Sequence, residues 1–282
     1  MKYGEALAFA IRSLSAASVP SPEADAHWLI CYAAGISRSE LLKPLSFDQE
    51  LSEPESGRLR ECLDLRVKRI PIQHITSSAG FLDFELEVGP GVFIPRPETE
   101  SVVQLGIDYL SAIDSNPIAL DIGAGSGAIA ISLARAISSA RVIAIELSPE
   151  AAVYTARNIA ALAPRVELRV GDFQEESLDL AGRVDLLISN PPYIPNHAVP
   201  IDQEVRDHDP ELALYGGEDG LDVIRDIIQL APVLLKRGGM LVLEHADGQS
   251  DQVCQLLLAT GFSKVQAHID LAERFRSVSA IW

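Results

Sequence analysis

The sequence predicts an α/β protein in which a small N-terminal helical domain precedes a seven-stranded, mostly parallel sheet covered by helices on both faces. Residues 1–75 show helical periodicity with almost no strand signal, whereas strand and helix patterns alternate from residue 99 onward. A glycine-rich run follows the first strand of the alternating part directly. Such a run is typical of a parallel sheet that binds a ligand at the carboxyl ends of its strands.

The first 75 residues are expected to form four helices. Apolar residues recur at helical spacing over residues 4–14. The other three helices begin at cap-like positions, namely Ser21 before Pro22, Ser37 before Glu40, and Ser52 before Glu55. Trp28 and Tyr32 lie four residues apart in the second helix, and we expect both in the core. Alternating apolar residues and a Gly-Pro-Gly turn then predict a β-hairpin within residues 76–97.

Residues 98–282 are expected to contain the sheet. Strand patterns lie at 118–122, 142–146, 166–170, 184–189, 240–244, about 264–268 and about 277–281. Helix patterns fill the gaps, notably at 127–138, 149–162, 221–235 and 250–259. This alternation implies a mostly parallel sheet with its ligand site at the carboxyl edge.

The composition limits the class of protein further. Of the 282 residues, 48% are hydrophobic and 22% charged, as in ordinary globular domains. No window approaches the ~20 consecutive apolar residues of a membrane-spanning helix, and Met1 to Glu5 show no basic segment followed by a long apolar run, so we expect neither export nor a membrane span. The three cysteines, Cys31, Cys62 and Cys254, are odd in number and far apart. We therefore expect a cytoplasmic protein without disulfides and without a cysteine metal site.

The charge balance bears on the partner. Lys and Arg number 23 against 40 Asp and Glu, which gives a formal net charge of -17 at pH 7. A protein that gains affinity by neutralising phosphates needs a basic face. The balance therefore disfavours a DNA or RNA binder and favours a protein or small-molecule substrate.

The glycine-rich run is Gly123-Ala124-Gly125-Ser126-Gly127. Its glycines let the backbone turn tightly and approach a ligand, and the following helix N-terminus presents free N–H groups. A nucleotide-like ligand is therefore expected. The run fits dinucleotide-binding proteins as well as S-adenosylmethionine (SAM) enzymes, and by itself leaves both open.

Further candidate cofactor residues follow the next two strands. Glu146 ends the strand 142–146, where its carboxylate can accept both hydroxyls of a ribose. Asp172 and Phe173 lie just past the third strand. They could supply an acceptor for an adenine amino group and an aromatic face for its ring.

Asn190-Pro191-Pro192-Tyr193, at the end of the fourth strand, indicates the chemistry. The two prolines hold an extended path, so the Pro191 carbonyl can point outward beside the side-chain carbonyl of Asn190. These two acceptors could bind both hydrogens of a planar NH2 group. Tyr193 can stack on that group and hold its nitrogen in line with a methyl donor, which is catalysis by positioning.

The tetrapeptide is the signature of SAM-dependent methyltransferases that act on amino groups. Three further stretches narrow the resemblance: Phe93-Ile94-Pro95-Arg96-Pro97-Glu98-Thr99-Glu100, Pro210 to Leu214 with Gly216 to Gly220, and Leu243-Glu244-His245. With them the chain resembles the HemK/PrmC family over nearly its whole length. Those enzymes methylate the side-chain nitrogen (N5) of the glutamine in the Gly-Gly-Gln motif of peptide chain release factors.

The resemblance implies a class I, Rossmann-like SAM-dependent methyltransferase domain at 98–282, behind a helical substrate-recognition domain at 1–75 and a linking hairpin at 76–97. It places SAM against Gly123 to Gly127, Glu146, Phe173 and Asn190. Asp172 is added to the cofactor residues because of its position beside Phe173. The resemblance places the substrate against Asn190, Pro191, Pro192 and Tyr193. Phe173 stands where the family often has Trp, and Ala246 where it usually has Gly. Release factors are the expected partners, with no membrane and no direct nucleic-acid substrate.

Four rival functions remain. Methylation of a glutamine in a ribosomal protein would use the same site. Methylation of an amino group of DNA or RNA is disfavoured by the negative net charge of the protein. A nicotinamide-dependent oxidoreductase or a non-enzymatic nucleotide-binding module would explain the glycines but not Asn190 to Tyr193.

The remaining polar residues are expected to have lesser roles. The acidic segment 196–220 lacks metal-ligand spacing and is expected to be a solvated lid over the site. His245 could accept a proton after transfer, although local hydrogen bonds are the simpler expectation. For Arg96, a contact with the peptide and a structural ion pair are left open.

Overall fold

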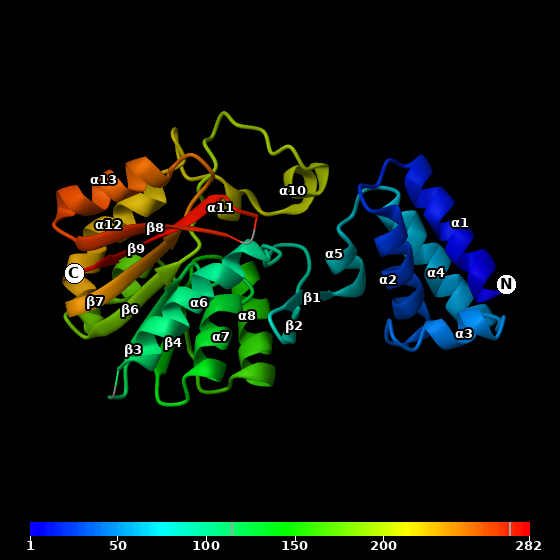
Figure 1. Cartoon of the computed structure of the whole chain (residues 1–282), viewed down its shortest axis with the longest axis horizontal. Helices are drawn as coiled ribbons and strands as arrows, with labels where there is room; N and C mark the ends of the chain where they lie inside the picture. Colours follow the sequence, from blue (N-terminus) through cyan, green and yellow to red (C-terminus); the bar gives the residue numbers. More distant parts are fainter. Residues whose placement is uncertain (114, 271) are drawn as a thin grey trace. The chain divides into compact units, whose positions relative to one another are not determined.

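The computed structural model describes the whole chain except residues 114 and 271 (Figure 1). The chain forms two compact units: a helical unit, Met1–Ser78 with Pro200–His208, and a sheet unit, Ala79–Val199 with Asp209–Trp282. These units differ from the predicted domains in two places. Most of the segment 76–97 groups with the sheet unit, and Pro200–His208 groups with the helical unit.

The first five helices of the helical unit pack around one apolar core (Figure 1). Its helices are α1 (Tyr3–Ala16), α2 (Pro22–Ala34), α3 (Leu42–Ser46), α4 (Glu53–Arg66), α5 (Ile72–Thr76) and α10 (Gln203–His208). Ser52 and Glu55 form the predicted capping box of α4. Ser37 and Glu40 also exchange capping hydrogen bonds, but a turn follows and α3 begins only at Leu42.

The expectation that Trp28 and Tyr32 are core residues is wrong. Their side chains are 45% and 46% exposed, and the Arg38 guanidinium lies 5.2 Å from the centre of the Trp28 ring. The buried face of α2 is instead formed by smaller residues, among them Leu29 and Ile30. Helical spacing alone could not decide which of the two apolar faces of α2 is buried.

The sheet unit contains a seven-stranded sheet of order β5-β4-β3-β6-β7-β9-β8. Its strands are β3 (Ile118–Ile122), β4 (Arg141–Glu146), β5 (Glu167–Val170), β6 (Val184–Ser189), β7 (Leu235–Glu244), β8 (Ser263–Ile269) and β9 (Phe275–Ile281). The pairs among β3 to β7 are parallel, and β9 runs antiparallel to both β7 and β8. The predicted mostly parallel, seven-stranded sheet is thus confirmed.

Helices cover both faces of this sheet (Figure 1). One apolar cluster contains residues of α6 (Glu98–Ser111), α7 (Ala128–Ala136) and α8 (Pro149–Leu162), and a second contains residues of α12 (Asp222–Leu234) and α13 (Ser250–Thr260). Neighbouring residues of β3 and β4 alternate between the two clusters; Ala119 joins the first and Leu120 the second. Burial on both faces explains why these strands read as continuous apolar runs.

Short elements complete the sheet unit. They are β1 (Ser78–Phe81) and β2 (Phe84–Glu87), which pair in a two-stranded sheet, together with α9 (Phe173–Glu176), a 3-10 turn (Leu178–Leu180) and α11 (Glu211–Leu214). In residues 1–113, 115–270 and 272–282, no helix has the length and hydropathy that crossing a membrane requires.

Candidate active site

The predicted site residues follow strands whose carboxyl ends lie at one edge of the sheet. Ile122, near the glycine-rich run, pairs with Ile145 of β4 on one side and with Ser189 of β6 on the other. Glu146 pairs with Val170 of β5. The register therefore brings the residues that follow β3, β4, β5 and β6 to the same edge, as parallel strands require.

The glycine-rich run turns sharply over the end of β4. The N–H groups of Gly123 and Ala124 both donate to the Ile145 carbonyl, at 2.9 and 3.0 Å. Gly123 and Gly125 have φ values of 74° and 56°, and an added Cβ at either would meet no atom within 4 Å. Open space thus lies against this backbone, as a ligand requires.

The other residues of the run serve packing. At Gly127, an added Cβ would approach Ile131 and Thr155, so this glycine permits close contact within the sheet unit. Ala124 and Ser126 are buried. The Ser126 carbonyl accepts a hydrogen bond of 2.9 Å from the side chain of Asn158.

Asp121, the last residue but one of β3, is a candidate that the sequence argument left without a role. Its side chain is fully buried, and its Oδ2 accepts from the N–H of Ala130 at 3.0 Å. Its Oδ1 is buried without a hydrogen-bond partner in the described part of the chain. Burial raises the pKa of this carboxyl to about 7. An acidic residue two positions before a glycine-rich run was the signal that could have identified it.

Glu146 lies buried at the end of β4 and braces the loop. Its Oε2 accepts from the N–H of Gly125 and its Oε1 from the N–H of Ser148, each at 2.7 Å. Burial raises the pKa of Glu146, and these two hydrogen bonds act against that rise. Two backbone donors therefore fix the direction of the carboxylate.

Asp172 and Phe173 lie at the start of α9, just past β5. The Asp172 side chain caps this helix by accepting from the N–H of Gln174 at 2.7 Å, and it is exposed. Phe173 is half-buried against the second apolar cluster. The cap fixes where the Asp172 carboxylate lies and leaves acceptor capacity on it.

The segment Asn190 to Tyr193 leaves the sheet beside the glycine-rich run. Ser189 ties the end of β6 to β3, since its hydroxyl donates to the Ile122 carbonyl at 2.6 Å. Asn190 Nδ2 donates to the hydroxyl of Thr99 at 3.2 Å, and the Tyr193 hydroxyl contacts Glu244 Oε1 at 3.4 Å. Pro191 is buried, and Pro192 is partly exposed.

The glycine-rich stretch 216–220 packs against the same segment. The N–H of Gly216 donates to the Ile194 carbonyl at 2.9 Å, and the side chain of Gln249 donates to the Tyr193 carbonyl at 3.1 Å. A Cβ at Gly216 would collide with the Pro192 carbonyl, and one at Gly220 with the Tyr193 carbonyl. Glycine is needed here because the two backbones touch.

Arg96 and His245 are both engaged locally. Arg96 forms an ion pair of 2.5 Å with the buried carboxylate of Asp209, which fulfils the structural alternative for this arginine. His245 is fully buried, its Nδ1 lies 2.8 Å from the Ala246 carbonyl, and burial lowers its pKa. Among the described residues, no group of three or more His, Cys, Asp or Glu could hold a metal ion.

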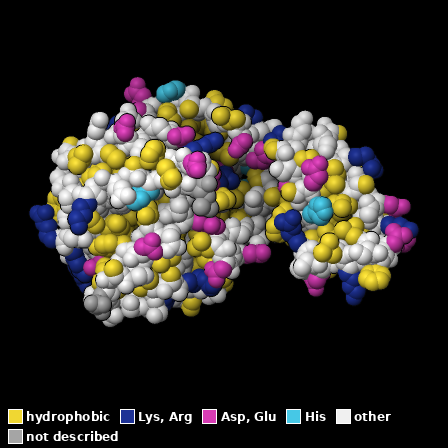
Figure 2. All heavy atoms as spheres, viewed as in Figure 1, with side chains coloured by type: hydrophobic (Ala, Val, Ile, Leu, Met, Phe, Trp, Pro, Cys, Tyr) yellow, Lys and Arg dark blue, Asp and Glu magenta, His cyan; other side chains and the backbone are white. Residues whose placement is uncertain are grey.

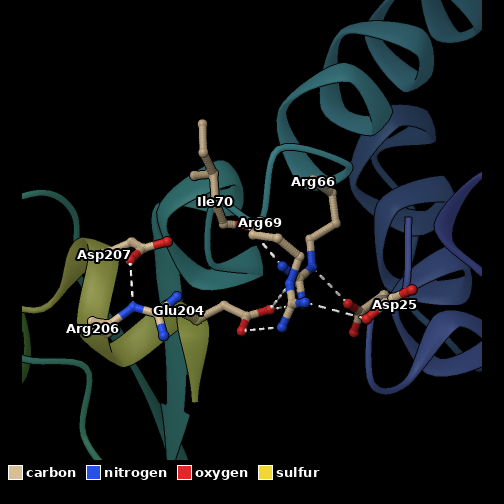
Figure 3. Close-up of polar contacts among 8 residues, drawn as sticks. Asp25, Arg66, Arg69, Ile70, Glu204, Arg206 and Asp207 are labelled. Carbon is tan, nitrogen blue, oxygen red and sulfur yellow. Dashed lines mark hydrogen bonds and ion pairs between the residues drawn. The ribbon is translucent and has the colours of Figure 1, made fainter. Parts of the chain in front are cut away.

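Within the acidic segment 196–220, Asp202, Arg206 and Asp207 are exposed, as predicted, but Glu204 is held by two arginines. Arg69 binds Glu204 through Nε at 2.8 Å, and Arg66 Nη2 lies 2.9 Å from the same carboxylate (Figure 3). Arg66 also donates to Asp25 at 2.7 Å. Burial alone would raise the pKa of Glu204, but the hydrogen bonds from the two arginines lower it to about 2. This network fastens α10 within the helical unit.

The visible surface agrees with the charge argument. On the face drawn in Figure 2, Lys and Arg side chains stand among Asp and Glu side chains and form no continuous basic patch. A nucleic acid would lack a basic platform on that face.

Comparisons with known proteins cover nearly the whole chain. Residues 5–76 match the family PrmC N-terminal domain, and residues 119–205 match a methyltransferase domain. The chain is 45% identical to a release factor glutamine methyltransferase of Streptomyces coelicolor, with 97% of this chain and 96% of the relative covered. It is 42% identical to one of Bifidobacterium longum, with 95% of each covered. A solved protein-(glutamine-N5) methyltransferase (release factor-specific) of Alicyclobacillus acidocaldarius shares 31% identity, covers 69% of this chain and 97% of its own, and has a TM-score of 0.43.

Proposed function

Since this chain belongs to the family of release factor glutamine methyltransferases, we propose that the residues at the carboxyl edge of its sheet carry out that reaction. The protein is a SAM-dependent methyltransferase, and its substrate is a release factor. The observation that supports the assignment of residues is the register, which puts Asn190 to Tyr193 beside Gly123 to Gly127.

Residues at the ends of β3 and β4, and in the loop after β3, fit the cofactor. The open backbone at Gly123 and Gly125 gives it room, and the buried Oδ1 of Asp121 is an acceptor that a cationic amino group would satisfy. Glu146 keeps acceptor capacity on both oxygens, which suits the two hydroxyls of a ribose. When bound, SAM supplies an electrophilic methyl group on a sulfonium.

The substrate is held, in this proposal, by acceptors and an aromatic ring. The carbonyl oxygens of Asn190 and Pro191 take the two N–H groups of the glutamine amide, and the ring of Tyr193 stacks on its plane. An amide nitrogen is a poor nucleophile, because its lone pair is delocalised into the carbonyl. Fixing the nitrogen in line with the methyl group therefore provides most of the acceleration.

The target is the glutamine of the Gly-Gly-Gln motif, because glycines before it let the substrate backbone come close without side-chain clashes. The helical unit recognises the body of the release factor. Its exposed Trp28 and Tyr32 offer the aromatic, apolar contacts that protein interfaces favour. The cell compartment in this proposal is the cytoplasm, where release factors act.

Mass spectrometry of a release factor incubated with this protein and SAM tests the proposal. We expect a gain of one methyl group on the Gly-Gly-Gln peptide. A methyl group on any other peptide, or none, would contradict the assignment of the substrate.

A further inference from the structure

A buried hydrogen-bond network lies directly behind the proposed substrate residues. Thr99 is in the first turn of α6 and Glu244 is the last residue of β7, and they are only 4% and 1% exposed. Glu244 Oε2 accepts from the Thr99 hydroxyl at 2.7 Å, and Thr99 Oγ1 accepts from Asn190 Nδ2 at 3.2 Å. The second carboxylate oxygen faces the Tyr193 hydroxyl at 3.4 Å. All four residues belong to the sheet unit.

The chemistry of these groups gives the network one direction. An ionised carboxylate can only accept, so the single hydroxyl proton of Thr99 is committed to Glu244. Thr99 Oγ1 then faces Asn190 with lone pairs, and only the NH2 end of the Asn190 amide can meet them. The opposite end, Oδ1, is consequently the one left to accept a hydrogen bond from a substrate.

We propose that Thr99 and Glu244 are positioning residues, which fix the direction of the Asn190 amide so that its carbonyl, rather than its NH2, faces the glutamine nitrogen. This inference rests on the proposed function. With the amide reversed, an NH2 group would face the NH2 group of the substrate, and two donors cannot bond to each other. Thr99 and Glu244 touch no substrate atom and act through Asn190 and Tyr193.

Burial of Glu244 has a second consequence for the network. Burial raises the pKa of this carboxyl to about 7, and the negative charge of Glu98 on α6 adds to the rise. The hydrogen bond from Thr99 and the positive charge of Arg276 on β9 act to lower the pKa. A protonated Glu244 could donate to Thr99 and release its hydroxyl proton toward Asn190. Tyr193 is the other titratable group that faces this carboxyl, and burial raises its pKa above the usual value.

Two substitutions at one position test the proposal. Thr99→Val keeps the shape of the side chain and removes the hydroxyl, whereas Thr99→Ser keeps the hydroxyl. We expect kcat on a release factor to fall at least ~30-fold in Thr99→Val, with KM changed less than ~3-fold, because docking of the release factor is untouched. Thr99→Ser should stay within ~3-fold of the wild type in both constants.

Glu244→Gln is the second perturbation. The Gln side chain can donate to Thr99, so it can reverse the network at constant size, and we expect a fall in kcat comparable to that of Thr99→Val. Thr260→Val is the matched control, because the Thr260 hydroxyl donates to the Leu256 carbonyl within α13. It should leave kcat unchanged.

A measurement on the Asn190 amide itself needs no turnover. The two side-chain NH2 signals of Asn190 are assigned in ¹H–¹⁵N spectra by their loss in Asn190→Ser. We expect them to move in Thr99→Val and Glu244→Gln, to stay in Thr99→Ser and Thr260→Val, and in the wild type to shift with pH around 7.

The outcomes separate the two proposals. If the wild type methylates no release factor, the proposed function fails, and the amide signals still decide whether the network sets the direction of Asn190. If the wild type is active, while Thr99→Val and Glu244→Gln are folded and keep wild-type kcat, the positioning role is overturned. If these variants do not fold, a nuclear Overhauser measurement on the wild type decides: Asn190 Nδ2 lies 3.2 Å from Thr99 Oγ1, and an Asn190 NH2 group without a contact to the Thr99 side chain overturns the positioning role.

Discussion

Replacing Glu146 should weaken SAM binding through two effects that the structure separates. The carboxylate is proposed to accept from the ribose, and it also binds the N–H groups of Gly125 and Ser148 at 2.7 Å each. In Glu146→Gln, one oxygen becomes an NH2 group that faces a backbone N–H. One loop bond and one ribose bond are then lost.

Each hydrogen bond to a charged group contributes about 1.5–3 kcal/mol. The loop bond is lost in the free protein as well as in the complex, so only part of its free energy appears as weaker SAM binding. We therefore expect Glu146→Gln to weaken SAM by about 1–3 kcal/mol, or roughly 5- to 150-fold in Kd. Glu146→Ala should be at least as severe, because both loop donors then lose their acceptor.

Isothermal titration calorimetry with SAM measures the loss, and thermal unfolding of the free protein measures the effect on the loop. Glu61→Gln, at an exposed position of α4, removes the same charge away from the site and serves as the control. A Kd for SAM in Glu146→Gln within twofold of the wild type would refute the role given to this carboxylate.

Three further predictions follow from other contacts in the structure. Asn190→Ala should lower turnover by at least ~100-fold in a folded protein, because the nucleophilic nitrogen loses its proposed acceptor. Tyr193→Phe should lower turnover less, because the ring remains. Steady-state kinetics on a release factor compares the two variants. Gly220→Ala should destabilise the protein by more than ~2 kcal/mol, because its Cβ would collide with the Tyr193 carbonyl. Gly4→Ala should stabilise α1 slightly, because a Cβ there meets nothing within 4 Å. Urea unfolding measures both variants, and equal stabilities would contradict the close packing at Gly220. The pKa of Glu204 is lowered from a reference value of 4.5 to about 2 in the folded protein, so its ionised form contributes stability above about pH 4.5 that is lost as the pH falls through 2. Glu204→Gln should therefore lower the free energy of unfolding at pH 7 more than at pH 3. Urea titrations at the two pH values measure this, and an equal loss at both would contradict the ion pairs.

The sheet could be predicted from the sequence because its strands are buried on both faces. Ile118–Ile122 and Val184–Ser189 have the predicted bounds, and both are nearly continuous apolar runs. The largest difference is at β7, which begins at Leu235 rather than at residue 240, whereas the remaining strands differ by one or two residues at an end. Its early part contains Lys236, Arg237 and two glycines, and its pairing with β6 shifts register there. Such irregular pairing leaves no periodic pattern.

The candidate site was predictable where one short motif brings its residues together, and not where the residues meet through the fold. Asn190 to Tyr193 are adjacent in sequence, so their joint role could be inferred. Thr99 and Glu244 are 145 residues apart, and the two stretches that contain them gave a family resemblance without a contact between them. Arg69 and Glu204, 135 residues apart, were likewise beyond any local pattern.

The most direct test of the account is transfer of a radiolabelled methyl group from SAM to three substrates: an intact release factor, its variant with the Gly-Gly-Gln glutamine replaced by alanine, and duplex DNA. The account predicts label in the intact release factor alone, since only the inserted glutamine can have both N–H groups held, and since a protein of net charge -17 repels a nucleic acid. Equal label in the alanine variant, or label mainly in DNA, would contradict it.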